Sequence, residues 1–133
     1  MRVAELMTVG ATSIAPDATI AEAVAVIADE HVSALPVVDH AGRFAGVLST
    51  TDILQSAAEA ADRTERERVF EETLVKDLMT ARPATVPVTA DIKEAAQQML
   101  YLEIHRLFVV DDEKLVGVIS QSDIVRGVAL ARI

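Results

Sequence analysis

The sequence lacks cysteine and tryptophan altogether, and aromatic residues make up only 3% of its 133 positions. The lack of cysteine excludes disulfides, thiolate nucleophiles and zinc–thiolate sites, and it makes a cytoplasmic location the default expectation. Because 51% of the residues are nevertheless hydrophobic, aliphatic side chains must form the core. A chain of this length predicts one domain, or two half-sized units that share a core.

Long apolar runs are also missing. The hydrophobic stretches are short, such as AVAVIA at 23–28, and none approaches the roughly 20 residues that a membrane-spanning helix needs. The first ten residues, MRVAELMTVG, include Glu5 and contain no apolar segment of the kind found in signal peptides. We therefore expect no membrane span and no secretion signal.

Positive charge is scarce: 12 Lys and Arg stand against 21 Asp and Glu, which gives a formal net charge of −9. A surface this acidic repels the phosphates of nucleic acids and of anionic membranes, so neither is expected as a partner. A small anionic ligand remains compatible with the composition, because a few local groups can outweigh the average field.

What the sequence does contain is an internal duplication. VAELMT at 3–8 matches VKDLMT at 75–80, and LPVVD at 35–39 matches LFVVD at 107–111. One residue is missing from the following turn of the second copy, and GVLSTTDI at 46–53 then matches GVISQSDI at 117–124. Matches that stay in register over two stretches of about 55 residues indicate a repeat.

Each copy has the pattern of a β-α-β-β-α unit. Apolar side chains at i, i+3, i+4, i+7 and i+8 are typical of an amphipathic helix. Thr19 with Glu22, and Asp91 with Glu94, mark the helix starts. The expected apolar faces are Ile20, Ala23, Val24, Ile27 and Ala28, and Ile92, Ala95, Ala96, Met99 and Leu100. The expected strands are 13–14, 35–38 and 45–48, then 85–86, 107–110 and 116–119, with second helices starting near Thr50 and Gln121.

The predicted fold class is therefore α/β, and more narrowly α+β. A single unit of this size buries little surface, and two units that pack sheet to sheet about a pseudo-twofold axis solve this problem. We predict a first repeat over 1–62, a connecting helix over 63–74 and a second repeat over 75–133. The connecting helix is interpreted as a solvated spacer, with contact to a partner as the alternative.

The duplicated Ser-x-x-Asp motif allows two interpretations. In the structural one, Ser49 and Ser120 cap helices, Asp52 and Asp123 favour the helix dipole, and the glycines at 46 and 117 lie where another backbone comes close. In the functional one, free amides at the helix start and the hydroxyls of Ser49, Thr51, Ser120 and Ser122 bind phosphate. The two aspartates then accept hydrogen bonds from ribose hydroxyls, as acids do in dinucleotide folds.

The second copy adds two donors, His105 and Arg106, directly before the strand expected at Leu107. Arginine can bind two phosphate oxygens at once. The alternative is a surface arginine paired with an acid such as Glu103. The first copy has Ser33 and Ala34 at the same positions, so we expect the second copy to hold an anion better.

These residues resemble those of CBS domains arranged as a tandem pair, the Bateman module. The motifs are SALPVVDHAGRFAGVLSTTDIL and HRLFVVDDEKLVGVISQSDIV, and the second is similar to the AMP-binding repeats of the γ subunit of AMP-activated protein kinase. The resemblance implies ribose binding by Asp52 and Asp123, and phosphate binding by Ser49 and Ser120 with Thr51 and Ser122 nearby. It implies adenine contacts at Ser13, Ala34, Pro36, Thr85, Arg106 and Phe108. Phe108 departs from the proline that is common there, and its ring either stacks on a base or fills the pocket.

Catalysis is not expected. There is no cysteine, and the three histidines at 31, 40 and 105 are scattered, so no metal pair and no base beside a nucleophile is predicted. The leading hypothesis is a stand-alone regulatory module that requires no cofactor. It would bind an adenine nucleotide, form a homodimer and pass its occupancy to an unknown downstream protein. The alternative is a ligand-free module for dimerisation or interaction.

Overall fold

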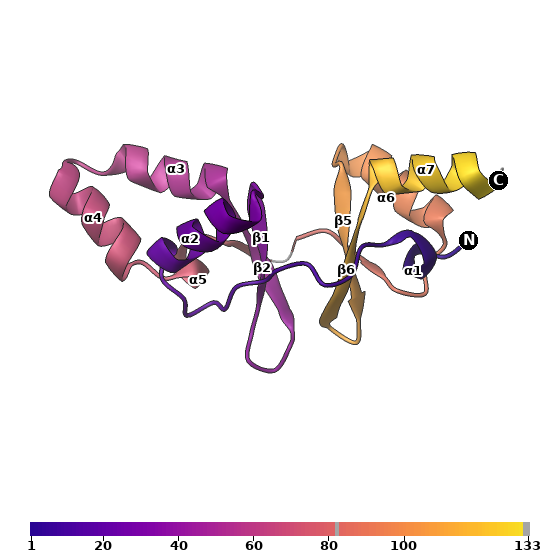
Figure 1. Cartoon of the computed structure of the whole chain (residues 1–133), viewed down its shortest axis with the longest axis horizontal. Coiled ribbons are helices and arrows are strands. Elements are labelled where there is room, and N and C mark those ends of the chain that lie inside the picture. Colours follow the sequence, from indigo (N-terminus) through magenta and orange to yellow (C-terminus); the bar gives the residue numbers. More distant parts are fainter. Residues whose placement is uncertain (82, 132–133) are drawn as a thin grey trace. The chain divides into compact units, whose positions relative to one another are not determined.

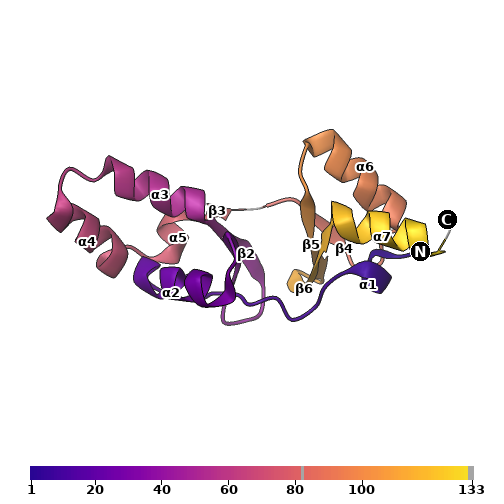
Figure 2. The same cartoon turned by 45° about the horizontal axis from the view of Figure 1, so that its top comes forward.

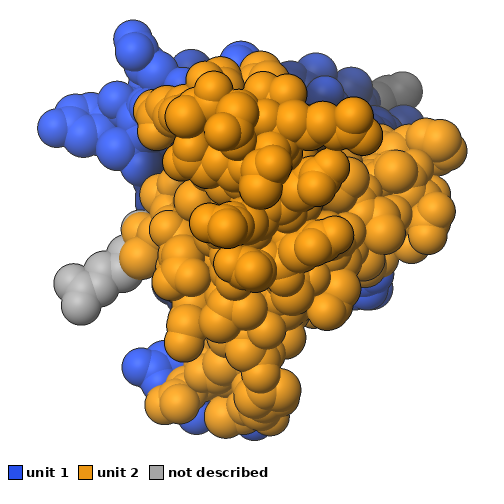
Figure 3. Space-filling view, turned by 90° about the vertical axis from the view of Figure 1, so that its left-hand side faces the viewer, with its two compact units in different colours: residues 1–11, 84–133 blue, residues 12–83 orange. Residues whose placement is uncertain are grey.

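The protein is described by a computed structural model that covers residues 1–81 and 83–131. The chain forms two compact units, coloured separately in Figure 3. Unit 1 comprises residues 1–11 together with the described part of 84–133, and unit 2 comprises residues 12–83 apart from position 82. Each unit holds one of two three-stranded sheets.

Unit 2 contains the first repeat from residue 12 onward and the segment that follows it (Figure 1). Its sheet has the order β1-β2-β3, and β2 pairs antiparallel with both neighbours. Ahead of α2, Ile14 forms a single parallel bridge with Val37. The elements of unit 2 are α2 (Ile20–Glu30), β1 (Ala34–Val38), β2 (Phe44–Ser49), α3 (Thr50–Glu59), α4 (Arg63–Glu72), α5 (Val75–Leu78) and β3 (Thr80–Ala81).

Unit 1 contains the described part of the second repeat from residue 84 onward and the start of the chain, with α6 and α7 both visible in Figure 2. In its sheet β4 pairs parallel with β5, and β5 pairs antiparallel with β6. The elements are α1 (Val3–Leu6), β4 (Thr85–Pro87), α6 (Ile92–Leu102), β5 (Arg106–Asp111), β6 (Lys114–Ser120) and α7 (Gln121–Ala131). The β-α-β-β-α order and the mixed fold class are confirmed, although the first strand of the first repeat is reduced to the bridge at Ile14. The packing of one sheet on the other stays a prediction.

The cores are almost entirely aliphatic, as the scarcity of aromatics requires. Burying such side chains is the dominant favourable contribution to folding. The buried residues of unit 2 are Ile14, Ile20, Ala23, Leu35, Val37, Leu48, Ile53 and Val75. Those of unit 1 are Val3, Val86, Ala90, Ala95, Met99, Leu107, Val109, Ile119 and Ile124.

The buried faces of α2 and α6 are narrower than the apolar faces predicted from the sequence. Val24 and Ala28 on α2 are exposed, and Leu100 on α6 is 74% exposed. Each sheet has only three short strands, so a helix packed on it covers a narrow stripe of side chains. On α2 that stripe contains the fully buried Ile20 and Ala23, with Ile27 partly buried at its end.

Two short segments, here called arms, carry the LMT motif. Each arm packs against the repeat other than the one that it begins in the sequence. The first arm, residues 1–8, belongs to the unit that contains the second repeat: Val3 N donates to Ala90 O (2.9 Å) and Thr8 N to Val118 O (2.8 Å). The second arm, residues 75–81, belongs to unit 2, where Val75 N donates to Ala18 O (2.8 Å). The compact units therefore differ from the sequence repeats 1–62 and 75–133. The last residues of the second repeat, 132–133, lie outside the described residues.

The connecting segment is a helix, α4, and it belongs to unit 2. Asp62 caps its start by accepting a hydrogen bond from Glu65 N (2.9 Å). Phe70 packs against the core of unit 2, while residues 63–68 are exposed. The helix is thus anchored at one end and solvated along the rest.

Candidate functional site

The Ser-x-x-Asp motifs form reciprocal capping boxes at the starts of α3 and α7. Ser49 Oγ accepts from Asp52 N (3.1 Å), and Asp52 Oδ2 accepts from Ser49 N (2.9 Å). The second copy repeats this arrangement, with Asp123 N donating to Ser120 Oγ (3.1 Å) and Ser120 N to Asp123 Oδ2 (2.8 Å). The structural interpretation of the motif is therefore realised in both repeats. Each serine still has its hydroxyl proton to donate, and each carboxylate keeps its second oxygen.

The helix starts are less open than the functional interpretation required. Gln121 N donates to His105 O and Thr50 N donates to Ser33 O, both at 2.9 Å. Together with the capping bonds, this leaves one amide in the first turn of each helix, at Thr51 and Ser122, without a partner among the described residues. The side chains of Thr51 and Ser122 are exposed. The expectation of a set of free amides is thus wrong, and hydroxyls and side-chain cations have to carry more of any anion binding.

The strand registers bring several of the other predicted residues together. In unit 1, Arg106 lies opposite Ser120 on the β5–β6 ladder. Thr85 lies opposite Phe108 on the β4–β5 ladder, and Phe108 is partly buried. Arg106 belongs to β5 itself and does not precede the strand, and its side chain is exposed, as is that of His105.

Unit 2 shows the same arrangement with different side chains. Ala34 lies opposite Ser49 on the β1–β2 ladder. Pro36 is buried, and its carbonyl oxygen accepts from Ile14 N (3.0 Å), which places the exposed Ser13 next to this part of β1. Each unit therefore gathers its own predicted residues at the end of its sheet where the second helix begins.

Sequence reasoning missed one ion pair beside the second Ser-x-x-Asp motif. Arg126 Nη2 lies 3.7 Å from Asp123 Oδ1, on the same face of α7. The Asp123 side chain is 14% exposed and that of Arg126 is 65% exposed. The i, i+3 spacing of the two residues is a signal that could have revealed the pair. The first repeat has Gln55 at the equivalent position.

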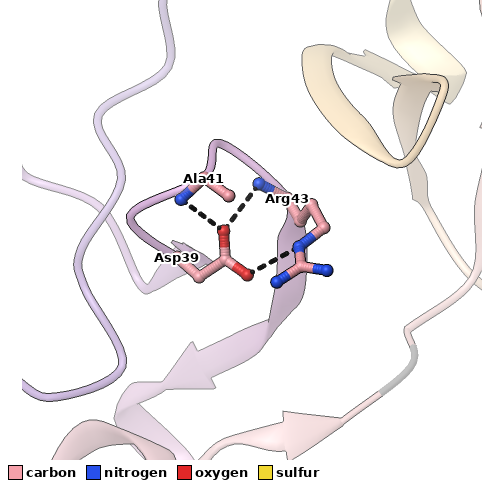
Figure 4. Close-up of polar contacts among 3 residues, drawn as sticks. All are labelled: Asp39, Ala41 and Arg43. Carbon is pink, nitrogen blue, oxygen red and sulfur yellow. Dashed lines mark hydrogen bonds and ion pairs between the residues drawn. The ribbon is translucent and has the colours of Figure 1, made fainter.

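The carboxyl groups with lowered pKa values do not belong to the Ser-x-x-Asp motifs at the starts of α3 and α7. In the β1–β2 turn, the backbone hydrogen bond from Arg43 N lowers the pKa of Asp39, with further help from Ala41 N and the Arg43 guanidinium (Figure 4). A hydrogen bond from His40 lowers the pKa of Asp17, and one from Lys93 N lowers that of Asp91. These groups stabilise turns and a helix start, and they do not form a catalytic set.

The histidines do not converge. His31 ends α2 in the left-handed region, and His40 lies 3.3 Å from Asp17 in a turn. Within residues 1–81 and 83–131, no group of three or more His, Cys, Asp or Glu residues is arranged to hold a metal ion. None of the helices in the same ranges combines the length and apolarity required to span a membrane.

The chain is thus a pair of β-α-β-β-α units, each with a reciprocal capping box at the start of its second helix. The family model for the CBS domain matches residues 3–59 and 75–130, and this chain belongs to that family. The resemblance inferred from the motifs is thereby confirmed.

Similar proteins come from bacteria, plants and animals. A CBS domain-containing protein, YhcV from Bacillus subtilis, is 29% identical over 92% of this chain and 81% of its own length. The γ-3 subunit of 5'-AMP-activated protein kinase from Sus scrofa is 30% identical over 86% of this chain and 22% of its own. The crystal structure of CBSX2 in complex with AMP superposes with a TM-score of 0.80 at 28% identity and covers 99% of this chain and 98% of that one. Two further curated relatives are longer than this chain, which spans 21% of the length of one and 57% of the length of the other.

Proposed function

We propose that this chain is a regulatory module that binds an adenine nucleotide beside the capped starts of α3 and α7 and passes its occupancy to a partner protein. The observation that supports this best is the arrangement in unit 1. Arg106 lies opposite Ser120 at one end of the β5–β6 ladder, and two hydrogen bonds hold Asp123 against Ser120. A hydroxyl and a cation suit phosphate, and a carboxylate oxygen suits the ribose diol.

The structurally similar CBSX2 complex supports adenine as the base, because the ligand in that structure is AMP. In the present chain Thr85 and Phe108 lie next to each other on adjacent strands of the same sheet. An aromatic ring beside a hydroxyl provides a surface on which a purine can stack, with a hydrogen-bonding group at its edge. We assign adenine contacts to Thr85 and Phe108 in unit 1 and to Ser13, Ala34 and Pro36 in unit 2.

We further propose that the module works as a homodimer in the cytoplasm. Large apolar side chains are exposed on two helices of unit 1, and exposed apolar patches mark interaction sites. A second copy of the chain would cover these side chains, and a shift in dimer geometry would report the ligand. The exposed residues are Leu100, Tyr101 and Leu102 on α6 and Val125, Val128 and Leu130 on α7. The net charge of −9 argues against nucleic acid or an anionic membrane as the partner.

The test is a thermal-shift and calorimetric screen of AMP, ADP, ATP, NADH and S-adenosylmethionine. A ligand at a hundredfold excess over its dissociation constant stabilises the fold by about 2.7 kcal/mol, so the melting temperature should rise by several degrees. We expect at least one adenine ligand to give this shift, and we expect Asp52→Asn combined with Asp123→Asn to remove it.

Asp62→Asn is the matched control, because Asp62 caps α4 with the same type of hydrogen bond but lies in the connecting segment. This variant should keep the full ligand-induced shift. If none of the five compounds shifts the wild-type protein, the nucleotide proposal fails. The apolar residues of α6 and α7 then favour the second candidate, a ligand-free dimerisation module, which sedimentation equilibrium would detect.

A further inference from the structure

The first arm, residues 1–8, is a separable part of unit 1. The rest of that unit begins at residue 84, so the arm is held in it only by non-covalent contacts. Thr8 N donates to Val118 O (2.8 Å) and Val118 N donates to Thr8 O (3.0 Å), which adds the arm to the edge of the sheet at β6. Val3 is fully buried in the unit 1 core. Unit 1 therefore binds a peptide segment whose covalent attachment lies in the other unit.

Two glycines shape the seat of this arm in unit 1. A Cβ atom at Gly127 on α7 would collide with Leu6 Cδ1, and a Cβ atom at Gly117 on β6 would lie 2.7 Å from Met7 Sδ. The position in unit 2 that is equivalent to Gly127 is Ser56. The surface of unit 1 is thus shaped to receive the side chains of this particular segment.

Residues 9–13 join the first arm to unit 2, and they have the properties of a hinge. All five are exposed, and none of them makes a hydrogen bond to any other described residue. Gly10 has a φ of +75°, and a Cβ atom built there would meet no described atom within 4 Å. This left-handed conformation is accessible to glycine and disfavoured for other residues. The course of the hinge therefore depends on its own backbone and not on packing.

The second arm, residues 75–81, is attached differently. The segment that precedes it is α4, which belongs to the same unit and packs Phe70 against the unit 2 core. Between α4 and this arm, Thr73 O accepts from Ile20 N (3.0 Å), and Val75 N then donates to Ala18 O (2.8 Å). The second arm is therefore connected to its own unit by the chain itself, and it could not leave without detaching α4.

We propose that the first arm is exchanged between two copies of this chain, so that residues 1–8 of each copy complete unit 1 of the other. The exchange reproduces every hydrogen bond and apolar contact of the arm, and only the hinge has to change, which makes it a low-cost route to a dimer. The partner is a second copy because its arm has the sequence that fits the seat at Gly117 and Gly127. This inference rests on the homodimer of the proposed function and specifies the segment that the two copies share.

The experiment uses engineered cysteines, for which a chain that lacks cysteine is a suitable background. Thr8 and Val118 donate to each other's carbonyl groups, and such antiparallel pairs have Cα atoms about 5.5 Å apart, within the range that a disulfide bridges. Full-length Thr8→Cys and Val118→Cys proteins are mixed, incubated at high concentration and oxidised. A disulfide between position 8 of one chain and position 118 of another, identified by mass spectrometry, requires the arm of one copy to lie on unit 1 of the other.

A mixture of Thr80→Cys and Val47→Cys is the matched control, because these two residues form the equivalent pair between the second arm and β2. We expect interchain disulfides between positions 8 and 118 and none between positions 47 and 80. Gly10→Val should raise the exchanged fraction about tenfold, since it disfavours the left-handed hinge. Ala11→Val adds a similar side chain to the same exposed hinge without a positive φ, and it should leave the fraction unchanged.

A single chain that carries both Thr8→Cys and Val118→Cys establishes that this pair can be oxidised. If the mixture nevertheless yields no interchain disulfide between positions 8 and 118, even with Gly10→Val, the inference is overturned. Equal yields from the two mixtures would overturn it as well, because global unfolding would exchange both arms. Sedimentation equilibrium of the wild type separates the proposals: a dimer without exchanged arms leaves the proposed homodimer intact, and a monomer at every concentration removes both.

Discussion

At the scale of single residues, the same side chain serves structure and offers chemistry. Ser120 and Asp123 cap α7 through two reciprocal hydrogen bonds, yet the serine proton takes no part in them and the second carboxylate oxygen is held only by the ion pair with Arg126. The two interpretations of the Ser-x-x-Asp motif are therefore compatible, because a capping box uses only part of the hydrogen-bonding capacity of each group. Capping alone is sufficient to explain why the motif occurs at a helix start.

Asp39 provides a residue-scale prediction about pH. The hydrogen bond from Arg43 N lowers the pKa of Asp39, so its ionised form is favoured in the folded state. For a carboxyl group with a lowered pKa, the stabilising contribution is complete above its unfolded pKa of about 4 and is lost as the pH falls through the folded pKa. We expect wild type to be more stable than Asp39→Asn at pH 7, with a difference that shrinks below about pH 4.

Urea denaturation of both proteins at several pH values measures this difference in the free energy of unfolding. Asp39 Oδ1 also accepts from Ala41 N (2.9 Å), and an asparagine oxygen can replace only part of this set of hydrogen bonds. A stability difference that stays constant from pH 7 down to about pH 2.5, well below the ordinary aspartate pKa, would contradict the assignment of the charge-dependent contribution to Asp39.

At the scale of elements, the glycines of the repeated motif are explained by the arms that cross the sheets. A Cβ atom at Gly46 would lie 2.6 Å from Thr80 O and 2.9 Å from Met79 Sδ. A Cβ atom at Gly117 would lie 2.7 Å from Met7 Sδ and 3.0 Å from Thr8 O. The glycine in each GV-x-S motif and the methionine and threonine of the LMT motif therefore form a matched pair, as the structural interpretation of these glycines expected.

The difference between the two clashes gives an element-scale prediction. Gly46→Ala and Gly117→Ala should each destabilise the fold by about 1–3 kcal/mol through overpacking. A side chain can be removed and a carbonyl oxygen cannot, so Met7→Ala should relieve much of the Gly117→Ala defect. Met79→Ala should relieve less of the Gly46→Ala defect, because Thr80 O stays at 2.6 Å.

Two double-mutant cycles, followed by chemical denaturation, provide the coupling energies. The favourable coupling between Gly117→Ala and Met7→Ala should exceed that between Gly46→Ala and Met79→Ala. Equal couplings would show that the backbone carbonyl moves aside as easily as the methionine side chain, contrary to this explanation.

At the scale of the whole molecule, the arms divide the chain differently from the repeats. Val3 is fully buried in the core of unit 1, and Val75 is fully buried in the core of unit 2. The first arm, which precedes the first repeat in the sequence, therefore completes the core of unit 1. The second arm, which precedes most of the second repeat, completes the core of unit 2. Leu6 and Met7 pack against the unit 1 core in addition to Val3, so the second repeat depends on residues from the opposite end of the chain.

The exchange of arms predicts where a core mutation acts. Val3→Ala removes two buried methyl groups and should cost roughly 2 kcal/mol. Hydrogen exchange should show faster local opening of β5 and β6 in this variant. Val75→Ala should have the same effect on β1 and β2. Val9→Ala is the control, because Val9 is 65% exposed and its truncation should change the stability by less than about 0.5 kcal/mol.

The outcome that would contradict the unit boundaries is a Val3→Ala variant whose β1 and β2 amides exchange faster while those of β5 and β6 are unaffected. In that case each arm would support the repeat to which it is adjacent in the sequence. The boundaries of the sequence repeats, and not those of units 1 and 2, would then define the regions that unfold locally together.

The sequence by itself determined the duplication, the order of elements in each repeat, the aliphatic core and the capped starts of α3 and α7. These features are local, since periodicity, β-branched runs and capping residues act within a few positions along the chain. The tertiary structure alone decided which sheet each arm completes, how narrow the buried stripe of α2 and α6 is, and which amides remain at the helix starts. Each of these depends on contacts between residues far apart in the sequence, such as Val3 with Ala90 and Thr8 with Val118, and no local pattern encodes such a contact.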